Sequence, residues 1–145
     1  MPAPQANPRM LLIQQLQKAI QGEHEAIQFY KALEPMAPPS HQKYIRDIRE
    51  EERTDHLLRF TNLYRQLTGR NPLLKPGPLP HDYISGLKRA LDDEQEAASF
   101  YKDVYLSSQD PYVRRLFFDA MNDEMRHATR IAFLYSNYFL EQGKI

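Results

Sequence analysis

The stretch EHEAIQFYK, residues 23–31, decides the fold, because it occurs a second time as EQEAASFYK at residues 94–102. Six of the nine positions are identical, and the offset between the two copies is 71 residues (94 − 23). A second pair, HLLRFTNLY at 56–64 and HATRIAFLY at 127–135, keeps the same offset. The chain therefore has two similar halves, which either an internal duplication or a shared structural demand explains.

Four long stretches of the chain have the periodicity of helices, with apolar residues recurring at steps of three and four. They lie near residues 9–34, 40–68, 81–107 and 110–141. No stretch alternates with a period of two, so no strand is expected. Short breaks separate the members of each pair, and the pairs should therefore form two antiparallel helical hairpins, 9–68 and 81–141.

The segment between the hairpins, TGRNPLLKPGPLPH at 68–81, contains four prolines and two glycines. An extended proline-rich segment of this length reaches roughly 43 Å, which matches the ~42 Å length of a 28-residue helix. Residues 69–80 are therefore expected to cross the full length of the bundle as a linker. The predicted fold is all-α, a single four-helix-bundle domain of residues 9–141, preceded by a disordered tail of residues 1–8 that contains three prolines.

The charge balance gives no reason to expect binding to nucleic acid or to a membrane. Lys plus Arg and Asp plus Glu both number 19, so the formal net charge is zero. No apolar run reaches the ~18 residues that span a bilayer. The N-terminal sequence MPAPQANP lacks the basic and apolar segments of a signal peptide, so a cytoplasmic location is expected.

The absence of cysteine restricts the chemistry. Thiol catalysis, disulfides, iron–sulfur clusters and thiolate metal sites are all excluded. Any metal ion must be bound by histidine, carboxylate, tyrosine or backbone oxygen. Ligands of these kinds favour iron, manganese, zinc, magnesium or calcium.

Charged residues interrupt the inward-facing apolar stripes of three helices near their middle. The interruption is Glu23 in the first helix, Glu94 in the third, and Glu124 with His127 in the fourth. Buried carboxylates are costly unless they are paired or bound to metal, and several together repel one another. Two divalent ions would balance four carboxylates, and the three-residue spacing of Glu124 and His127 lets both reach one ion. The stripes therefore predict a metal site at mid-height in the core.

The second helix departs from the repeat within the sequence EEERTDH. His56 matches His127 at the offset of 71, but the same offset pairs Glu124 with Arg53. At an offset of 72, Glu52 matches Glu124 instead. The second helix therefore carries one extra residue between Glu52 and His56.

Three hypotheses account for this extra residue. A helix absorbs one inserted residue most easily as a π-bulge, and a bulge near 52–56 would turn both Glu52 and His56 toward the site. Alternatively, Asp55 binds the metal in place of His56, since Glu52 and Asp55 keep the three-residue spacing. In the third hypothesis, the site has lost a ligand and holds one metal ion or none.

These motifs make the sequence similar to the ferritin-like superfamily, and most closely to its rubrerythrin-like members, over about residues 9–140. EHEAIQFY at 23–30 and EQEAASFY at 94–101 resemble the first-helix and third-helix patterns of the family. EMRH at 124–127 resembles the fourth-helix pattern. The resemblance implies a ferritin-like four-helix bundle with one long crossover, in which two helices supply one Glu each and two supply Glu-x-x-His.

The resemblance also implies the contents of the site: two iron ions, with manganese or zinc as alternatives. The metal ligands it implies are Glu23, Glu52, His56, Glu94, Glu124 and His127, with Asp55 as the alternative to His56. Tyr30 and Tyr101 each follow a ligand glutamate by seven residues. They are expected to hydrogen-bond a ligand carboxylate or to carry an electron.

The activity implied by the resemblance is oxidation of iron, or reduction of peroxide or O₂, at a di-iron carboxylate centre. The Cys-rich rubredoxin domain of rubrerythrins is not expected in a chain without cysteine, so an external electron donor is expected. Ala97 stands where rubrerythrins carry a further carboxylate, so their redox-linked ligand switch is not expected. A homodimer is also implied. Two other classes stay open: an iron-binding or storage protein without turnover, and a metal-free helical scaffold or coat-type protein with a degenerate site.

Overall fold

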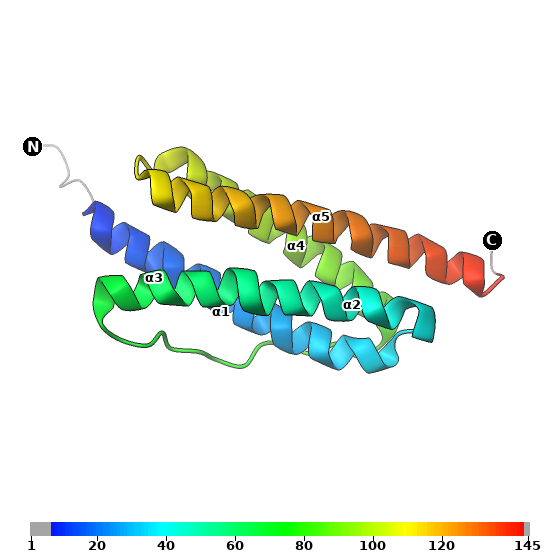
Figure 1. Cartoon of the computed structure of the whole chain (residues 1–145). Coiled ribbons are helices and arrows are strands. Elements are labelled where there is room, and N and C mark those ends of the chain that lie inside the picture. Colours follow the sequence, from blue (N-terminus) through cyan, green and yellow to red (C-terminus); the bar gives the residue numbers. More distant parts are fainter. Residues whose placement is uncertain (1–6, 144–145) are drawn as a thin grey trace, which may run out of the picture.

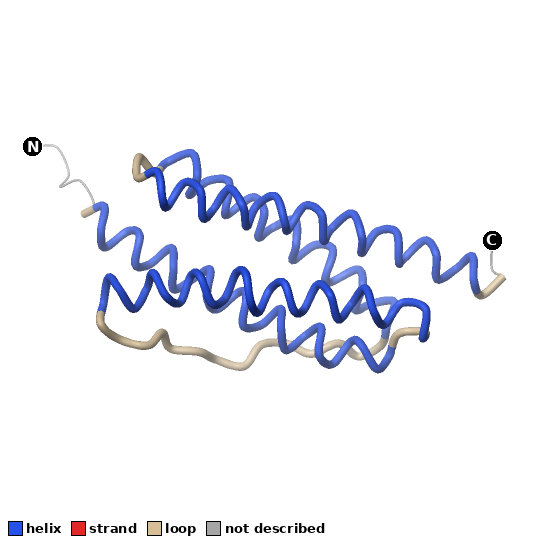
Figure 2. Tube along the Cα trace, viewed as in Figure 1, coloured by secondary structure: helices blue, strands red, loops and turns tan. Residues whose placement is uncertain are grey.

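Four long helices run side by side through residues 7–143, the part of the chain that the computed structural model describes (Figure 1). Three of these helices are continuous: α1 (Pro8–Leu33), α4 (Tyr83–Ser107) and α5 (Pro111–Glu141). The other consists of α2 (Pro39–Glu51), the π-helical segment η2 (Glu52–Leu57) and α3 (Leu58–Thr68), and a 3₁₀ turn, η1 (Glu34–Met36), joins it to α1. No strand occurs among residues 7–143, as Figure 2 shows, so the all-α fold is confirmed.

The helices α1, α4 and α5 begin at residues whose side chains cap them. The side chain of Asn7 accepts a hydrogen bond from the backbone N–H of Arg9, and Pro8 takes the first helical position of α1. The helix therefore begins one residue before the predicted start at residue 9. Asp82 and Asp110 cap α4 and α5 in the same way. Residues 1–6, which were predicted to form most of a disordered tail, lie outside the described residues.

The linker between α3 and α4 runs the length of the bundle beside α1 (Figure 1). Gln17 donates a hydrogen bond to the carbonyl of Leu73, and Gln21 exchanges two hydrogen bonds with the backbone of Lys75. A side chain at Gly77 would place its Cβ 2.5 Å from Cγ of Glu25, so only glycine permits this close approach. The predicted crossover connection is thus present, and α1 holds it in place.

Two apolar clusters fill the core, one on each side of a polar layer. One contains Leu16, Phe60 and Phe117, and the other contains Leu33, Ile45, Leu87 and Ile131. Six buried ionisable side chains occupy the layer between them, and they are Glu23, Glu52, His56, Glu94, Glu124 and His127. The polar layer therefore lies at mid-height and is shielded from water by packed side chains at both ends.

None of the helices within residues 7–143 combines the length and the apolar character that crossing a bilayer requires.

Candidate metal centre

Each of the four long helices contributes to the polar layer. Glu23 comes from α1 and Glu94 from α4, Glu52 and His56 come from η2, and Glu124 and His127 come from α5. None of the six residues is more than 4% exposed. Their ligand atoms form two groups of four, each within 4.8 Å: Glu23, Glu52, His56, Glu124 and Glu52, Glu94, Glu124, His127. Glu52 and Glu124 belong to both groups, so either carboxylate would be within reach of an ion in each group.

The π-helical segment η2 directs the side chains of both Glu52 and His56 into the polar layer. At an offset of 72 residues, the buried Ile45, Ile48 and Glu52 match buried residues of α5. Downstream, the buried His56 and Phe60 each lie one residue beyond the positions that match His127 and Ile131. The wider π turn absorbs the extra residue, so that both registers face the core. The predicted π-bulge is therefore present at 52–57.

Asp55, the alternative to His56, does not reach the polar layer. Its side chain is exposed, and its carboxylate accepts a hydrogen bond from the hydroxyl of Thr54 at 3.3 Å. The neighbouring Arg53 is exposed as well and pairs with Glu50 at 2.8 Å. The bulge thus turns residues 53–55 outward, and the geometry favours His56 over Asp55 as a ligand.

The Nδ1 atoms of the two histidines each face three carboxylates. Nδ1 of His56 lies 3.2 Å from Glu23, 3.0 Å from Glu124 and 3.6 Å from Glu52. Nδ1 of His127 lies 2.8 Å from Glu52, 3.6 Å from Glu94 and 3.5 Å from Glu124. The two imidazoles are therefore equivalent partners in a nearly two-fold arrangement of carboxylates.

The outer nitrogens of the same histidines bind two further carboxylates. Nε2 of His56 lies 2.9 Å from Asp123, and Nε2 of His127 lies 2.8 Å from Glu51. Arg126 donates to both of these acids, at 2.9 Å and 2.7 Å. When each Nε2 carries the proton, Nδ1 is left with a free electron pair directed at the carboxylates, as a metal ligand requires.

Glu51 and Asp123 were not among the site residues predicted from the sequence. A signal for them existed, because each directly precedes a ligand candidate, Glu52 or Glu124, and the two acids keep the offset of 72 residues (123 − 51). Both are half-buried and tied to a histidine from the other hairpin. Which acid meets which histidine depends on how the hairpins dock, and the repeat alone does not indicate it.

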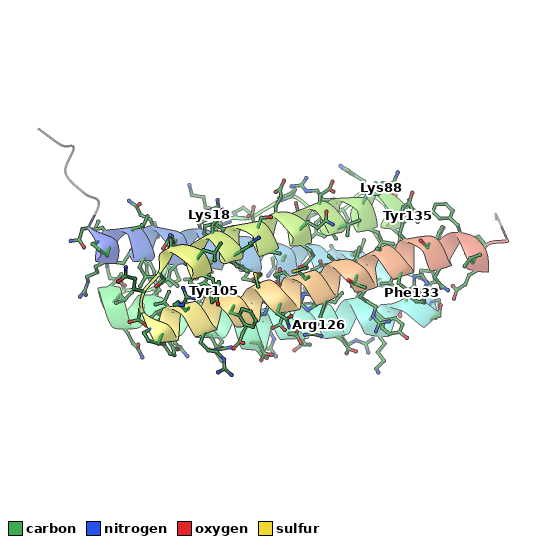
Figure 3. All side chains as sticks on the ribbon, turned by 90° about the horizontal axis from the view of Figure 1, so that it is seen from above. Lys18, Lys88, Tyr105, Arg126, Phe133 and Tyr135 are labelled. Carbon is green, nitrogen blue, oxygen red and sulfur yellow. The ribbon has the colours of Figure 1, made fainter. Side chains whose placement is uncertain are left out.

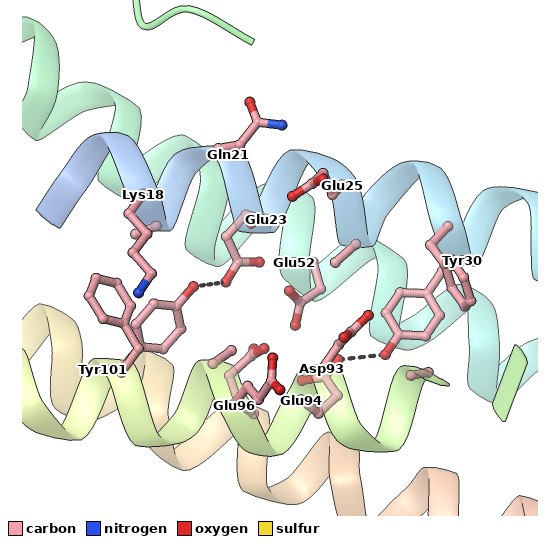
Figure 4. Close-up of a pocket in the computed structure, with 18 of the residues that line it drawn as sticks. Lys18, Gln21, Glu23, Glu25, Tyr30, Glu52, Asp93, Glu94, Glu96 and Tyr101 are labelled. Carbon is pink, nitrogen blue, oxygen red and sulfur yellow. Dashed lines mark hydrogen bonds between the residues drawn. The ribbon is translucent and has the colours of Figure 1, made fainter. Parts of the chain in front are cut away.

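The two tyrosines cross between the halves of the repeat (Figure 4). The hydroxyl of Tyr30 donates to Oε1 of Glu94 at 2.5 Å, and that of Tyr101 donates to Oε1 of Glu23 at 2.5 Å. Each bond fixes one oxygen of a glutamate and leaves the other to point into the layer. The hydrogen bonding expected of both tyrosines is therefore observed.

Burial and mutual repulsion strongly perturb the carboxylates of the layer. Burial raises the pKa of Glu23 well above its usual value, and the neighbouring charge of Glu52 adds to the effect. The pKa values of Glu94 and Glu124 are raised for the same two reasons. Burial also opposes ionisation of Glu52, but contacts with Glu23 and both histidines outweigh it and lower its pKa. Without metal, the layer therefore holds protons that the unfolded chain would release.

The histidines and tyrosines respond to the same negative field. Burial opposes charging of His56 and His127, but the surrounding carboxylates outweigh burial and raise both pKa values. Burial, followed by the charges of Glu94 and Glu23, raises the pKa values of Tyr30 and Tyr101 well above the usual range. The layer therefore attracts positive charge strongly, whether protons or metal ions supply it.

The unpaired atoms of the layer provide a test of whether metal ions fit. Among the described residues, six buried side-chain atoms lack a hydrogen-bond partner, and all six belong to this layer: Oε2 of Glu23, both oxygens of Glu52, Oε2 of Glu94, Oε1 of Glu124 and Nδ1 of His127. Nδ1 of His127 lies 2.8 Å from Oε1 of Glu52 without forming a hydrogen bond. This geometry suits two ligands directed at a common ion. Carboxylate and imidazole donors suit iron, manganese or zinc.

The fold and the site together define a class of protein. A four-helix bundle with one long crossover, carrying four glutamates and two histidines in its core, has the architecture of the ferritin-like carboxylate proteins. Within that class, the chain belongs to the rubrerythrin family, which it matches over residues 14–135.

Similarity to individual proteins agrees with this assignment. The chain is 37% identical over 134 residues to the uncharacterized protein YhjR of Bacillus subtilis (strain 168), covering 91% of this chain and 89% of YhjR. A hypothetical protein of Pyrococcus furiosus has the same fold, with a TM-score of 0.78, 21% identity and 92% coverage of both chains. A conserved hypothetical protein of Mycobacterium tuberculosis superposes with a TM-score of 0.76 at 16% identity, covering 88% of this chain and 93% of that one.

Proposed function

We propose that the polar layer holds two metal ions, iron in the first place, and that the protein oxidises Fe(II) or reduces peroxide or O₂. The observation that carries the proposal is the set of six unpaired buried atoms, all in one layer of carboxylates and histidines. Unpaired buried polar atoms destabilise a fold by about 1–3 kcal/mol each, and metal ions would satisfy all of them at once. Manganese and zinc are alternatives that the same donors accept.

The charges of the layer support two divalent ions in particular. Four glutamates carry four negative charges when ionised, and two neutral histidines add none. Two divalent cations would balance this charge, whereas one would leave two carboxylates uncompensated in a buried site. Two Fe(II) ions bound here would supply one electron each to O₂ or peroxide.

The chain's own residues would hold and shield the reaction. Tyr30 and Tyr101 orient Glu94 and Glu23, and Asp123 and Glu51 fix the rings of the two histidines. The apolar clusters above and below close the layer to water at its two ends. The raised pKa of Tyr101 keeps its hydroxyl protonated, so it serves as a hydrogen-bond donor rather than as a base. An external electron donor and a homodimer remain predictions from the family resemblance.

Metal analysis of protein purified without chelator tests the proposal. We expect about two iron ions per chain, and a change in near-ultraviolet absorption when peroxide is added to the anaerobic Fe(II) form. Protein that holds iron but shows no such change would favour binding without turnover. Protein that binds no metal, and whose melting temperature does not move with added Fe(II), Mn(II) or Zn(II), would favour the metal-free scaffold and contradict the proposal.

A further inference from the structure

A cavity of about 440 Å³ opens between α1 and α4 and leads to the polar layer (Figure 4). Its inner end is formed by the carboxylates Glu23, Glu52, Glu94 and Glu124. Pro78 of the crossover linker borders it on one side. The cavity therefore connects the surface of the bundle with the side of the proposed metal site that faces α1 and α4.

The cavity is larger than the proposed oxidants require. A water molecule takes up about 30 Å³ of liquid, and O₂ or peroxide is not much larger. An apolar cavity of about 150 Å³ is enough to bind benzene. A volume of about 440 Å³ therefore leaves room for an organic molecule beside two metal ions and an oxidant.

Small side chains keep this space open. Ala19, Gly22 and Ala26 lie along one face of α1, and Ala90 and Ala97 lie one repeat of seven apart on α4. Gly22 is exposed at the mouth, and no atom lies within 4 Å of the position its Cβ would take. Glycine inside a helix makes the helix less stable than alanine would, and at this position no neighbouring atom would clash with a side chain. Its effect is to leave the mouth of the cavity unobstructed.

The charges of the cavity wall that no ion pair neutralises among the described residues include two acids, Glu25 and Glu96, and these disfavour an anionic ligand. The ammonium of Lys18 lies 4.3 Å from the ring centre of Phe100, and Arg89 pairs with Asp93 at 3.1 Å. The hydroxyls of the two tyrosines in the wall are already donated to glutamates. The rest of the wall is an aromatic and methyl surface, and it ends at the unpaired carboxylate oxygens of the polar layer.

We propose that this cavity binds a small uncharged organic molecule, about the size of one aromatic ring, with a hydroxyl at one end. The apolar body would lie between the alanines of α1 and α4, and the hydroxyl would point toward the polar layer. Only the contact of the hydroxyl with metal rests on the proposed function. The body of the molecule is recognised by the shape and apolar character of the wall.

Fluorine NMR of 4-fluorophenol, titrated into zinc-loaded and metal-free protein, tests this proposal. We expect saturable binding to the wild-type chain. Gly22→Leu and Ala97→Leu should weaken it by at least about tenfold, because both fill the space that the ring would occupy. Gln28→Leu is the matched control, since Gln28 is exposed on α1 and does not line the cavity. Circular dichroism melting of each variant shows that it is folded.

Four outcomes decide the proposal. Equal binding by the cavity-filling variants, or no saturable binding to folded wild-type protein, overturns it. Benzoate of similar size should bind more weakly than 4-fluorophenol, and equal or tighter binding overturns the assignment to uncharged ligands. Zinc content is measured in the same samples. Cavity-dependent binding in protein that takes up no zinc supports the cavity while contradicting the metal site.

The outer face of α5 carries a second, independent feature. Within residues 116–140 of α5, ten side chains are exposed and eight of them are uncharged: Phe118, Asn122, Met125, Thr129, Ala132, Phe133, Ser136 and Leu140. The other two, Arg126 and Arg130, turn to their own chain, Arg126 to Glu51 at 2.7 Å and Arg130 over the ring of Tyr44 at 4.4 Å. Figure 3 looks down on this side of the bundle, with Phe133 and Arg126 labelled.

The large apolar residues of this face are arranged symmetrically about Thr129. Phe118 and Leu140 lie eleven residues away on either side, and Met125 and Phe133 lie four residues away. All four are between 43% and 59% exposed. Antiparallel pairing of two copies would set Met125 against Phe133 of the partner subunit. A fully buried aromatic side chain covers ~150–250 Å². Because each of these four large residues is only about half exposed, pairing would bury roughly half of such an area per residue. Together they would supply roughly half of the ~800 Å² per partner in a standard interface.

The family resemblance already implies a homodimer, and we infer that its two-fold interface is the outer face of α5. Sedimentation velocity should give a dimer for the wild-type protein and a monomer for Met125→Arg and for Phe133→Arg. Leu106→Arg, which changes an exposed leucine on α4, is the control and should stay dimeric. A monomeric wild-type protein, or dimers in both arginine variants, overturns the inference.

Discussion

Nδ1 of His56 lies 3.6 Å from Oε1 of Glu52, four residues earlier in the π-helical segment, and both side chains are buried. On α5, the equivalent atoms of Glu124 and His127 lie 3.5 Å apart with a spacing of three residues. The two pairs reach nearly the same separation through different helix geometries. The bulge therefore restores a symmetry that the inserted residue would otherwise break.

Deletion of Thr54 tests the role of the bulge. Thr54 is exposed on η2, and its removal leaves Glu-Arg-Asp-His, with the spacing of Glu124 and His127. We expect a folded protein with a regular helix and unchanged metal stoichiometry, because both registers then face the core without a bulge. Deletion of Asn62, which shifts the register after the site, should destabilise the fold strongly. Loss of metal on deletion of Thr54 would show that the bulge itself is required.

Alanine substitutions separate the two ligand candidates. His56→Ala should lower the metal content from about two ions per chain to about one or fewer, because the group of four ligands around Glu23 loses its only nitrogen. Asp55→Ala should retain the full content, since Asp55 is exposed. Elemental analysis after gel filtration measures both. The opposite pattern would rule out the ligand set that the geometry favours.

Removal of a tyrosine hydroxyl should weaken the metal-free fold. Tyr30→Phe leaves Oε1 of Glu94 without its hydrogen-bond donor in a buried position. Such a loss costs about 1–3 kcal/mol in the free energy of unfolding. Urea denaturation of metal-free protein measures it, with Tyr112→Phe, on an exposed residue, as the control. Equal stability of both variants and the wild type would indicate that the bond contributes nothing net.

The stability of the metal-free protein should fall as the pH rises from about 5 to about 9. Glu23, Glu94 and Glu124 have raised pKa values, so above the ordinary value of 4.5 the folded state binds protons that the unfolded chain has lost. The raised pKa values of the two histidines also lower stability with rising pH, above about pH 6.5, because the folded state keeps protons that the unfolded chain has lost. Glu52 has a lowered pKa and therefore contributes stability at pH values above 4.5. That contribution is lost only when the pH falls below this value.

Urea midpoints measured across this pH range provide the check. Zinc-loaded protein is the comparison, because metal binding releases the protons and should become tighter as the pH rises. We therefore expect the difference in stability between the zinc-loaded and metal-free forms to widen with pH. Metal-free protein that gains stability from about pH 5 to about pH 9 would contradict the charge balance described for the layer.

Substitution of Gly22 should stabilise the protein. Gly22→Ala places a methyl group where no atom lies within 4 Å, and alanine is favoured over glycine inside a helix by about 0.5–1 kcal/mol. Thermal and urea unfolding measure the gain. Gly77→Ala is the opposite control, because its Cβ would lie 2.5 Å from Cγ of Glu25. A destabilising Gly22→Ala would mean that a neighbour does occupy this space.

Much of the site could be predicted because its ionisable residues interrupt the apolar stripes by which the helices pack into the core. Glu23, Glu94, Glu124 and His127 interrupt stripes that are otherwise apolar, and the spacing of the stripes fixes which way each side chain faces. The extra residue in the second helix was visible as a change of offset from 72 to 71. Its local consequence, a π-helical segment at 52–57, follows from the cost of turning the apolar residues on one side of the insertion, such as Phe60 and Leu63, away from the core.

Other parts could not be predicted because they depend on contacts between elements far apart in the sequence. The choice of His56 over Asp55 was open until the bulge was seen to turn residues 53–55 outward. Glu51 and Asp123 look like surface charges in the sequence, and only the docking of the two hairpins brings each to a histidine. The cavity arises where α1 and α4 face each other with small side chains.

By itself, the sequence determined the number and direction of the helices, the crossover, and the set of buried acids, because hydrophobic periodicity and repeat offsets are local properties of the chain. Only the tertiary structure decided which carboxylates the two groups of four side chains share, which tyrosine binds which glutamate, and how much space lies beside them. These depend on distances of a few ångströms between different helices, and packing of the whole core sets those distances.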